Sequence, residues 1–175
     1  MRRPPRARDV SIFEPSLLWL GVLQGVLLGG LYAMFAAGLS LIFGVMRLVN
    51  IAHGDLIVLA AYVALVTTEA LGINPLLSLV FVVPAMAVIG YVLQRGLLNR
   101  TLGDDLLPPL LVTFGLTVII ESLIQSIWTA DPRMMDSAYG AMKFKIGALY
   151  VPFPELLTLI FAVGLSMCTW AALRY

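Results

Sequence analysis

The chain has 175 residues, of which 61% are hydrophobic and only 12% carry a charged side chain. Soluble domains have about 25% charged residues, so the composition excludes an ordinary soluble globular protein. The formal net charge is +1 and no basic stripe is present, so nothing indicates a nucleic-acid partner.

Long uncharged runs dominate the chain, at residues 15–46, 70–94 and 156–173. Each is close to or above the roughly 20 apolar residues that a membrane-spanning helix requires. The sequence therefore predicts an all-α, polytopic transmembrane helical bundle in a lipid bilayer. Asn74-Pro75 marks a tight turn between two of its segments. The apolar segments number about five: 16–46, 56–73, 75–94, 106–130 and 155–173.

A polar tail rich in Arg and Pro, residues 1–15, precedes an unusually long first segment. This segment is too long for the hydrophobic region of a signal peptide, so we expect it to be retained as the first span. As one helix it would extend roughly 46 Å, against a hydrocarbon core of about 30 Å. It must therefore tilt, break or re-enter. Gly38 and Gly44 are the candidate break points, because Gly weakens a helix.

Small residues recur every four positions along the first segment. Residues four apart share one face of a helix, and a stripe of small side chains lets another helix approach closely. We expect this face to pack against a second helix. Its members are Gly21, Gly25, Gly29, Ala33 and Ala37.

A polar cluster separates the first two apolar segments. It contains Arg47, Asn50, Asp55 and His53, the only histidine of the chain. One interpretation is a short solvated loop; the other is a polar site facing the protein interior or a water-filled path, because ionisable groups are expensive near the membrane core. We expect Asn50, His53 and Asp55 to lie at a helix break, where Asp55 caps the following helix.

The fourth segment carries a second stripe, in this case of polar residues. Polar side chains on a spanning helix face a bundle interior or a cavity. The stripe is either a structural hydrogen-bond seam, with Glu121 protonated or paired, or the lining of a substrate path. Its central residues Thr117, Glu121 and Gln125 are candidate path residues. The whole stripe consists of Thr113, Thr117, Glu121, Gln125 and Thr129.

Residues 131–154 form the only sizeable polar excursion between spans. The alternation of Met142-Lys143-Phe144-Lys145-Ile146 between Gly and Pro residues predicts a short strand or hairpin. Such a hairpin either caps the bundle or offers a docking surface to a partner.

Signatures of enzymes are missing from the sequence. Neither lysine follows a glycine, so there is no nucleotide-binding loop, and no Gly-x-Ser-x-Gly turn occurs. A single His and the lone Cys168 provide no zinc site, thiolate metal site or disulfide. We therefore expect a non-enzymatic protein without metal or cofactor, for which a partner must supply any driving energy.

Two sequence motifs match a known pattern. Gly44-Val-Met-Arg47 is followed by Asn50-Ile-Ala-His-Gly-Asp55, and Leu111-Val-Thr-Phe-Gly-Leu-Thr117 opens the fourth segment. Together with the run that begins at Gly21, they resemble the N-terminal half of branched-chain amino-acid ABC transporter permeases. The resemblance covers about residues 16–173.

The resemblance implies a multi-pass permease domain over residues 16–175, in the inner membrane of a bacterium or archaeon. It implies an importer of branched-chain amino acids or a related small polar solute, such as urea or a short amide, that works by alternating access. The implied partners are a second permease subunit, two cytoplasmic ATPase subunits and a periplasmic or extracellular substrate-binding protein. Rival interpretations are a passive channel or facilitator and a structural membrane subunit.

Orientation is also addressed by the resemblance, which implies that residues 95–109 are cytoplasmic and 131–154 external. Positive charges do not decide it, because five crossings and a re-entrant first segment both divide Lys and Arg seven against four. The chain departs from the family at Gln94-Arg95 and Arg100-Thr101, where Glu-Arg and Arg-Pro are usual. Family members also continue with further spans, so the resemblance predicts an incomplete permease.

Overall fold

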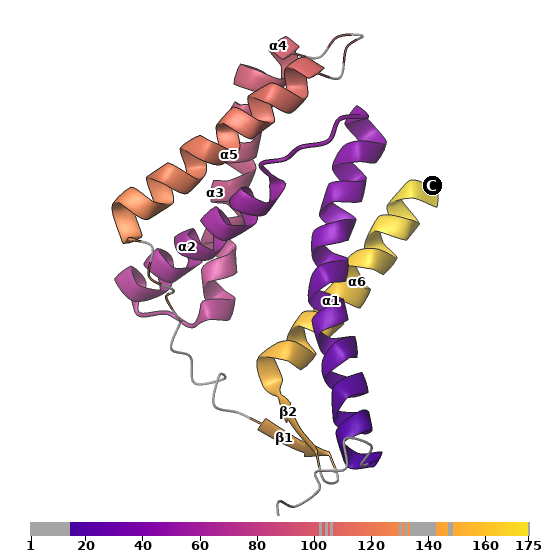
Figure 1. Ribbon diagram of the computed structural model, residues 1–175. Helices are drawn as coiled ribbons and strands as arrows, with labels where there is room; N and C mark the ends of the chain where they lie inside the picture. Colours follow the sequence, from indigo (N-terminus) through magenta and orange to yellow (C-terminus); the bar gives the residue numbers. More distant parts are fainter. Residues whose placement is uncertain are drawn as a thin grey trace, which may run out of the picture. The chain divides into compact units, whose positions relative to one another are not determined.

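The structure is a computed structural model that describes residues 15–101, 103, 105, 107–129, 131, 133, 143–146 and 149–174. The polar tail before residue 15 and Met142 lie outside the described residues. Figure 1 shows the elements in chain order. They are α1 (Pro15–Met46), α2 (His53–Leu71), α3 (Pro75–Leu93), the π-helical η1 (Gln94–Leu98), α4 (Asn99–Thr101), α5 (Leu107–Trp128), β1 (Lys143–Ile146), β2 (Leu149–Pro152) and α6 (Phe153–Arg174).

Five helical stretches among the described residues are long and apolar enough to cross a membrane. They are α1, α2, the run Pro75–Thr101 that joins α3, η1 and α4, α5 and α6. Large apolar side chains are exposed on all of them, as expected for surfaces that meet lipid or neighbouring helices. The predicted fold class, an all-α polytopic membrane protein, is confirmed.

The first span is one uninterrupted helix of 32 residues, visible as the indigo to purple ribbon in Figure 1. At 1.5 Å per residue it extends about 48 Å, so it must tilt or extend beyond a core of about 30 Å. It has no interruption at which the chain could turn back, so the helix is not re-entrant. The predicted break at Gly38 or Gly44 is wrong, because both glycines lie inside α1. The helix ends instead after Met46, where Arg47 has a left-handed φ of 52°.

The turn between α2 and α3 follows the chemistry of its residues. Gly72 ends α2 with a left-handed φ of 60°, a conformation that glycine adopts without steric cost. The Asn74 side chain then accepts a hydrogen bond from the Leu76 amide at 3.0 Å, and Pro75 occupies the first helical position. A cap followed by Pro is a strong start signal for a helix, so the turn predicted at Asn74-Pro75 is confirmed.

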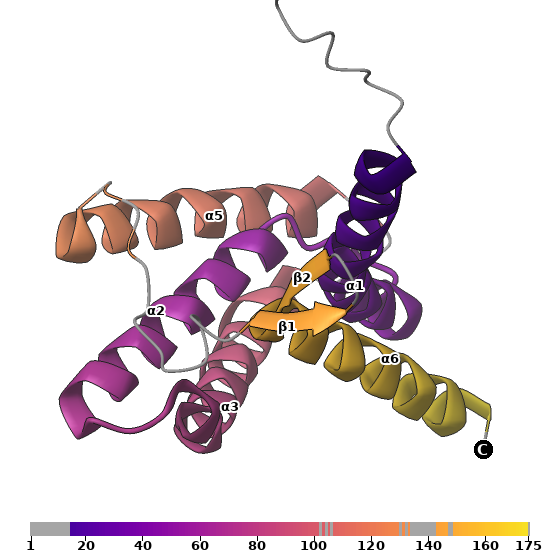
Figure 2. The same cartoon turned by 90° about the horizontal axis from the view of Figure 1, so that it is seen from below.

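The chain divides into two compact units. One unit, Phe35–Ala141, contains the end of α1 together with α2, α3, η1, α4 and α5. In it, α2 packs against α3 and α5, as both views show (Figure 2). Its buried core joins Ala52 to Leu116, Ile120 and Ile124 of α5. At its edge the rings of Tyr62 and Trp128 lie 4.8 Å apart between centroids.

The other unit comprises Met1–Met34 and Met142–Tyr175. Its strands β1 and β2 pair antiparallel, with Lys143 opposite Pro152 and Ile146 opposite Leu149, so the predicted hairpin is confirmed. The hairpin leads directly into α6. The start of α1 and α6 meet at Gly30, where an added Cβ would lie 3.1 Å from the Leu159 Cα atom.

Candidate functional site: the α1–α2 turn and the polar face of α5

Asn50 shapes the turn between α1 and α2 from within. Its side chain is 7% exposed, and its Oδ1 atom accepts a hydrogen bond from the Ala52 amide at 3.1 Å. The Asn50 carbonyl lies 3.3 Å from the His53 amide nitrogen and accepts its hydrogen bond. Leu48 and Ala52 are 2% and 0% exposed, so apolar packing holds both sides of the turn. Asn50 therefore supplies the local hydrogen bonds of a compact, largely buried turn.

His53 links the start of α2 to α1. Its Nε2 atom lies 3.2 Å from the Phe35 carbonyl oxygen, 18 positions earlier in the chain. A carbonyl only accepts hydrogen bonds, so in this pair Nε2 carries the proton and donates it. A Cβ atom added to Gly38 would lie 3.1 Å from the His53 Cε1 atom and 3.3 Å from Nε2. Gly38 thus makes room for the imidazole, which explains a glycine at this position without a helix break.

Asp55 plays a different part from the one expected. Ala52 is the N-cap of α2, and no side chain makes a capping hydrogen bond there. Asp55 is the third helical residue, so the expected cap is wrong. Its carboxylate still lies in the first turn, where a negative charge interacts favourably with the helix dipole.

The polar stripe on α5 passes from the interior to the surface. Thr113 is 0% exposed and donates its hydroxyl to the Leu110 carbonyl. The Thr117 Oγ1 atom is buried and lacks a hydrogen-bond partner among the described residues. Glu121 and Gln125 are exposed on the described chain. This divergence follows from helix geometry, because each step of four residues turns the stripe by about 40°.

The two parts of the candidate site meet through apolar contacts. Ala52, within the α1–α2 turn, belongs to the same buried cluster as Leu116 and Ile120 of α5. Thr117 follows Leu116 directly in the sequence. The Asn50 side chain binds a backbone amide of the turn and His53 lies within hydrogen-bond distance of a backbone carbonyl of α1, whereas Glu121 and Gln125 face away from the core.

The three glycines of the small-residue stripe on α1 make no close contact with another helix among the described residues. An added Cβ at Gly21, Gly25 or Gly29 would meet nothing within 4 Å, and Ala33 is exposed while Ala37 is half-buried. Close contact is made by the neighbouring Gly30. The pair Gly29-Gly30 was the available signal, but spacing alone does not tell which of the two faces α6.

Sequence reasoning also misses the partners of His53. Phe35 and Gly38 look like ordinary residues of an apolar helix, and only the folded structure shows that they lie against His53.

Thr68, on α2, resembles Thr117 in having a buried Oγ1 atom without a partner among the described residues. Among those residues no group of His, Cys, Asp and Glu is arranged to hold a metal ion.

Comparison with known proteins places these motifs in a family. Residues 21–175 match the family described as "Branched-chain amino acid transport system / permease component". The chain is also 23% identical over 111 residues to the high-affinity branched-chain amino acid transport system permease protein BraD of Pseudomonas aeruginosa. That alignment covers 59% of this chain and 36% of BraD, and no solved structure matches. The chain belongs to the family of permease components of branched-chain amino acid transport systems.

Proposed function

We propose that this chain forms a membrane-spanning part of an ABC importer for branched-chain amino acids, working by alternating access. The observation that carries the proposal is the family match over residues 21–175, which includes the α1–α2 turn. The five membrane-length helices support it, since a permease must cross the bilayer repeatedly. The name of BraD, a branched-chain amino acid permease protein, supports the choice of solute.

We assign partners on the same basis. The family resemblance supports two separate cytoplasmic subunits that hydrolyse ATP, and the lack of a nucleotide-binding loop in this sequence agrees with that assignment. A second permease subunit would complete the translocation path, and an external binding protein would deliver the solute. The location that fits this assembly is the inner membrane of a bacterium or archaeon.

The proximity of two helix ends supports an orientation of the chain in the membrane. The end of α1 lies beside the start of α5, because Phe43, Arg47 and Val49 line a cavity of about 130 Å³ together with Pro109 and Leu110. This proximity supports a topology in which the α1–α2 turn and the loop before α5 share one side of the membrane. We propose that this is the cytoplasmic side, as the resemblance implies for residues 95–109, and that residues 131–154 are external.

Within this assembly the two parts of the site have separate roles. Asn50 and His53 would fix the geometry of the α1–α2 turn, and Asp55 would stabilise the first turn of α2. Thr117, Glu121 and Gln125 would line the solute path or face the second permease subunit. The exposure of Glu121 supports this, because a carboxylate facing lipid near the bilayer centre costs about 2.5–3.5 kcal/mol on insertion scales.

Uptake of labelled leucine tests the proposal. The chain is expressed in bacteria that lack branched-chain uptake, together with a candidate second permease subunit, and with and without candidate ATPase and binding-protein subunits. We expect ATP-dependent uptake only with both partners, and competition by isoleucine and valine. Urea and acetamide as competitors test the related solutes. ATP-independent uptake by the chain alone would indicate a facilitator, and an intact assembly that transports none of these solutes would favour a structural subunit.

A further inference from the structure

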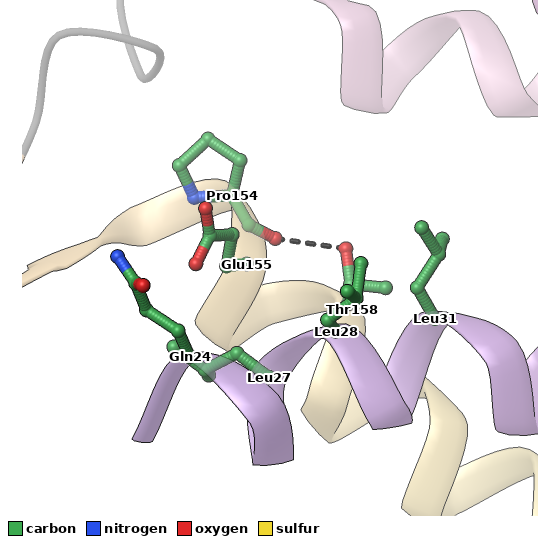
Figure 3. A pocket seen from close by; sticks show the side chains of 7 residues that line it. All are labelled: Gln24, Leu27, Leu28, Leu31, Pro154, Glu155 and Thr158. Atoms are coloured by element: carbon green, nitrogen blue, oxygen red, sulfur yellow. Dashed lines mark hydrogen bonds between the residues drawn. The ribbon is translucent and has the colours of Figure 1, made fainter. Parts of the chain in front are cut away.

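A groove of about 430 Å³ lies between α1 and α6, within the unit Met1–Met34 and Met142–Tyr175. It is lined by four residues of α1 and three from the start of α6, and Figure 3 shows all seven side chains. Its volume falls in the range of about 300–1,000 Å³ typical of small-molecule sites. The lining residues are Gln24, Leu27, Leu28, Leu31, Pro154, Glu155 and Thr158.

Hydrogen-bond acceptors gather at one end of this groove. Gln24 and Glu155 lie at the same end in Figure 3, and Thr158 lies between them and the apolar end. The Thr158 hydroxyl donates to the Pro154 carbonyl at 2.8 Å, so its oxygen lone pairs remain available as acceptors. The carboxylate, the amide oxygen and the hydroxyl oxygen together favour a ligand that donates hydrogen bonds.

Glu155 gives this end a negative charge. It lies in the first turn of α6, and its side chain is exposed on the described chain. The structure shows no ion pair for Glu155 among the described side chains. A compact ammonium group carries three donors and a positive charge, so it complements both the acceptors and the carboxylate.

The other end of the groove is aliphatic. Leu31 lies at the end away from Gln24, and Leu28 is 52% exposed, whereas the buried Leu27 lies beside Gln24. A branched alkyl group would make van der Waals contacts with this leucine surface. A ligand with an ammonium at one end and a short branched chain at the other therefore matches both ends of the groove.

We propose that the α1–α6 groove binds the ammonium and alkyl parts of an aliphatic amino acid. The inference that this amino acid is the transported solute rests on the proposed function. The chemical class of the ligand, an aliphatic primary ammonium, follows from the groove alone. Neither Gln24 nor Glu155 belongs to the polar turn or to the polar face of α5, so the groove is a separate site.

Ligand-observed NMR titration of the purified full chain in detergent tests this site with three probes. They are L-leucine, 3-methylbutylamine, which lacks the carboxylate, and 4-methylpentanoate, which lacks the ammonium. We expect leucine and the amine to bind saturably and to compete, and 4-methylpentanoate not to bind. Glu155→Gln should weaken the binding of both amines by about tenfold or more, because it removes a charge-assisted contact.

Two further variants and their controls separate binding from folding. Leu28→Phe should fill the groove and weaken amine binding, whereas Val26→Phe, at a similarly exposed position outside it, should not. Glu69→Gln removes a carboxylate on α2, outside the groove, and should leave binding unchanged. Circular dichroism checks that each variant keeps its helices.

The site is overturned if the parent chain shows no saturable amine binding, if Glu155→Gln binds as tightly as the parent, or if 4-methylpentanoate binds equally well. Leucine uptake by the assembled transporter separates the two proposals. Uptake that persists unchanged in Glu155→Gln contradicts the inference that the amino acid bound in the groove is the transported solute, while the proposed function stands. Amine binding that depends on Glu155, together with no leucine uptake by any assembly, supports the groove and contradicts the proposed function.

Discussion

The turn between α1 and α2 and the polar face of α5 are both rich in polar residues within an apolar chain, but their polar groups are satisfied differently. In the turn, Asn50 and His53 form hydrogen bonds to backbone atoms of the same chain. On α5, Glu121 and Gln125 are exposed, and Thr117 has a buried hydroxyl without a partner among the described residues. The turn is thus complete within this chain, and the α5 face is not.

The difference follows from what each region needs in order to fold. A buried polar group without a partner costs about 1–3 kcal/mol, so a turn as buried as this one requires hydrogen bonds made within the chain itself. The exposed residues on α5 do not hinder folding of the chain, but lipid would penalise Glu121. We infer that substitutions in the turn affect stability, whereas those on the α5 face affect the assembled transporter.

The largest effect on stability is expected for Gly38→Val. The new side chain would collide with the His53 imidazole, whose Cε1 atom would lie 3.1 Å from the added Cβ. We expect a loss of about 1–3 kcal/mol, the usual cost of overpacking, and a lower unfolding midpoint in detergent. Gly44→Val is the matched control, because nothing lies within 4 Å of a Cβ at that position of the same helix. Equal midpoints for the two variants would contradict the contact between Gly38 and His53.

Asn50→Ala should have the next largest effect. It removes the acceptor of the buried Ala52 amide, and an unsatisfied buried donor costs about 1–3 kcal/mol. Asn50→Asp keeps an oxygen in the same place and should recover part of this loss. The measurement is again the unfolding midpoint in detergent. If Asn50→Ala is as stable as the parent, water reaches the turn and the turn is less closed than the structure shows.

Sequence patterns predict the spans well and their contacts poorly. Uncharged runs indicate where helices cross a membrane, and Asn74-Pro75 and the alternation near Phe144 have local physical causes, so these elements are confirmed. Gly38 was mistaken for a break because a glycine that weakens a helix and one that admits a neighbouring side chain look the same in sequence. Only the fold of the chain reveals that His53 is this neighbour.

The same limit explains the small-residue stripe. Spacing identifies the face of α1 that carries Gly25 and Gly29, but the helix that packs on α1 here, α6, follows much later in the chain and meets Gly30. The position of a distant helix depends on the whole fold and not on local periodicity. Whether the stripe packs against a helix outside the described residues stays a prediction, and so does the path role of Glu121.

A smaller effect is expected for Asp55→Ala. Because Asp55 makes no capping hydrogen bond, its stabilising interaction is with the dipole of α2, which is typically about 0.3–1 kcal/mol. The loss should shrink at high salt, since added ions screen the interaction. Asp55→Asn, compared at low and high salt, isolates the charge from the shape of the side chain. A loss as large as that of Asn50→Ala, and independent of salt, would show that Asp55 has a buried partner.

The smallest effect on the stability of the isolated chain, and the largest contrast with the turn, is expected for Glu121→Leu. Its side chain is exposed and outside the buried face formed by Leu116 and Ile120, so the unfolding midpoint should stay within about 0.5 kcal/mol of the parent. In the assembled transporter the same change removes a polar group from the path or from the subunit interface, so leucine uptake should fall. Glu121→Gln keeps the shape and a hydrogen-bonding end, and should preserve assembly.

A cysteine at position 121 then distinguishes the two environments of the α5 face. The cysteine should react with a water-soluble thiol reagent if the face lines a path, and resist it if the face is a dry interface. Quenching of a label on that cysteine by a lipid-borne quencher in the assembled transporter would contradict both, because it would place the α5 face against lipid.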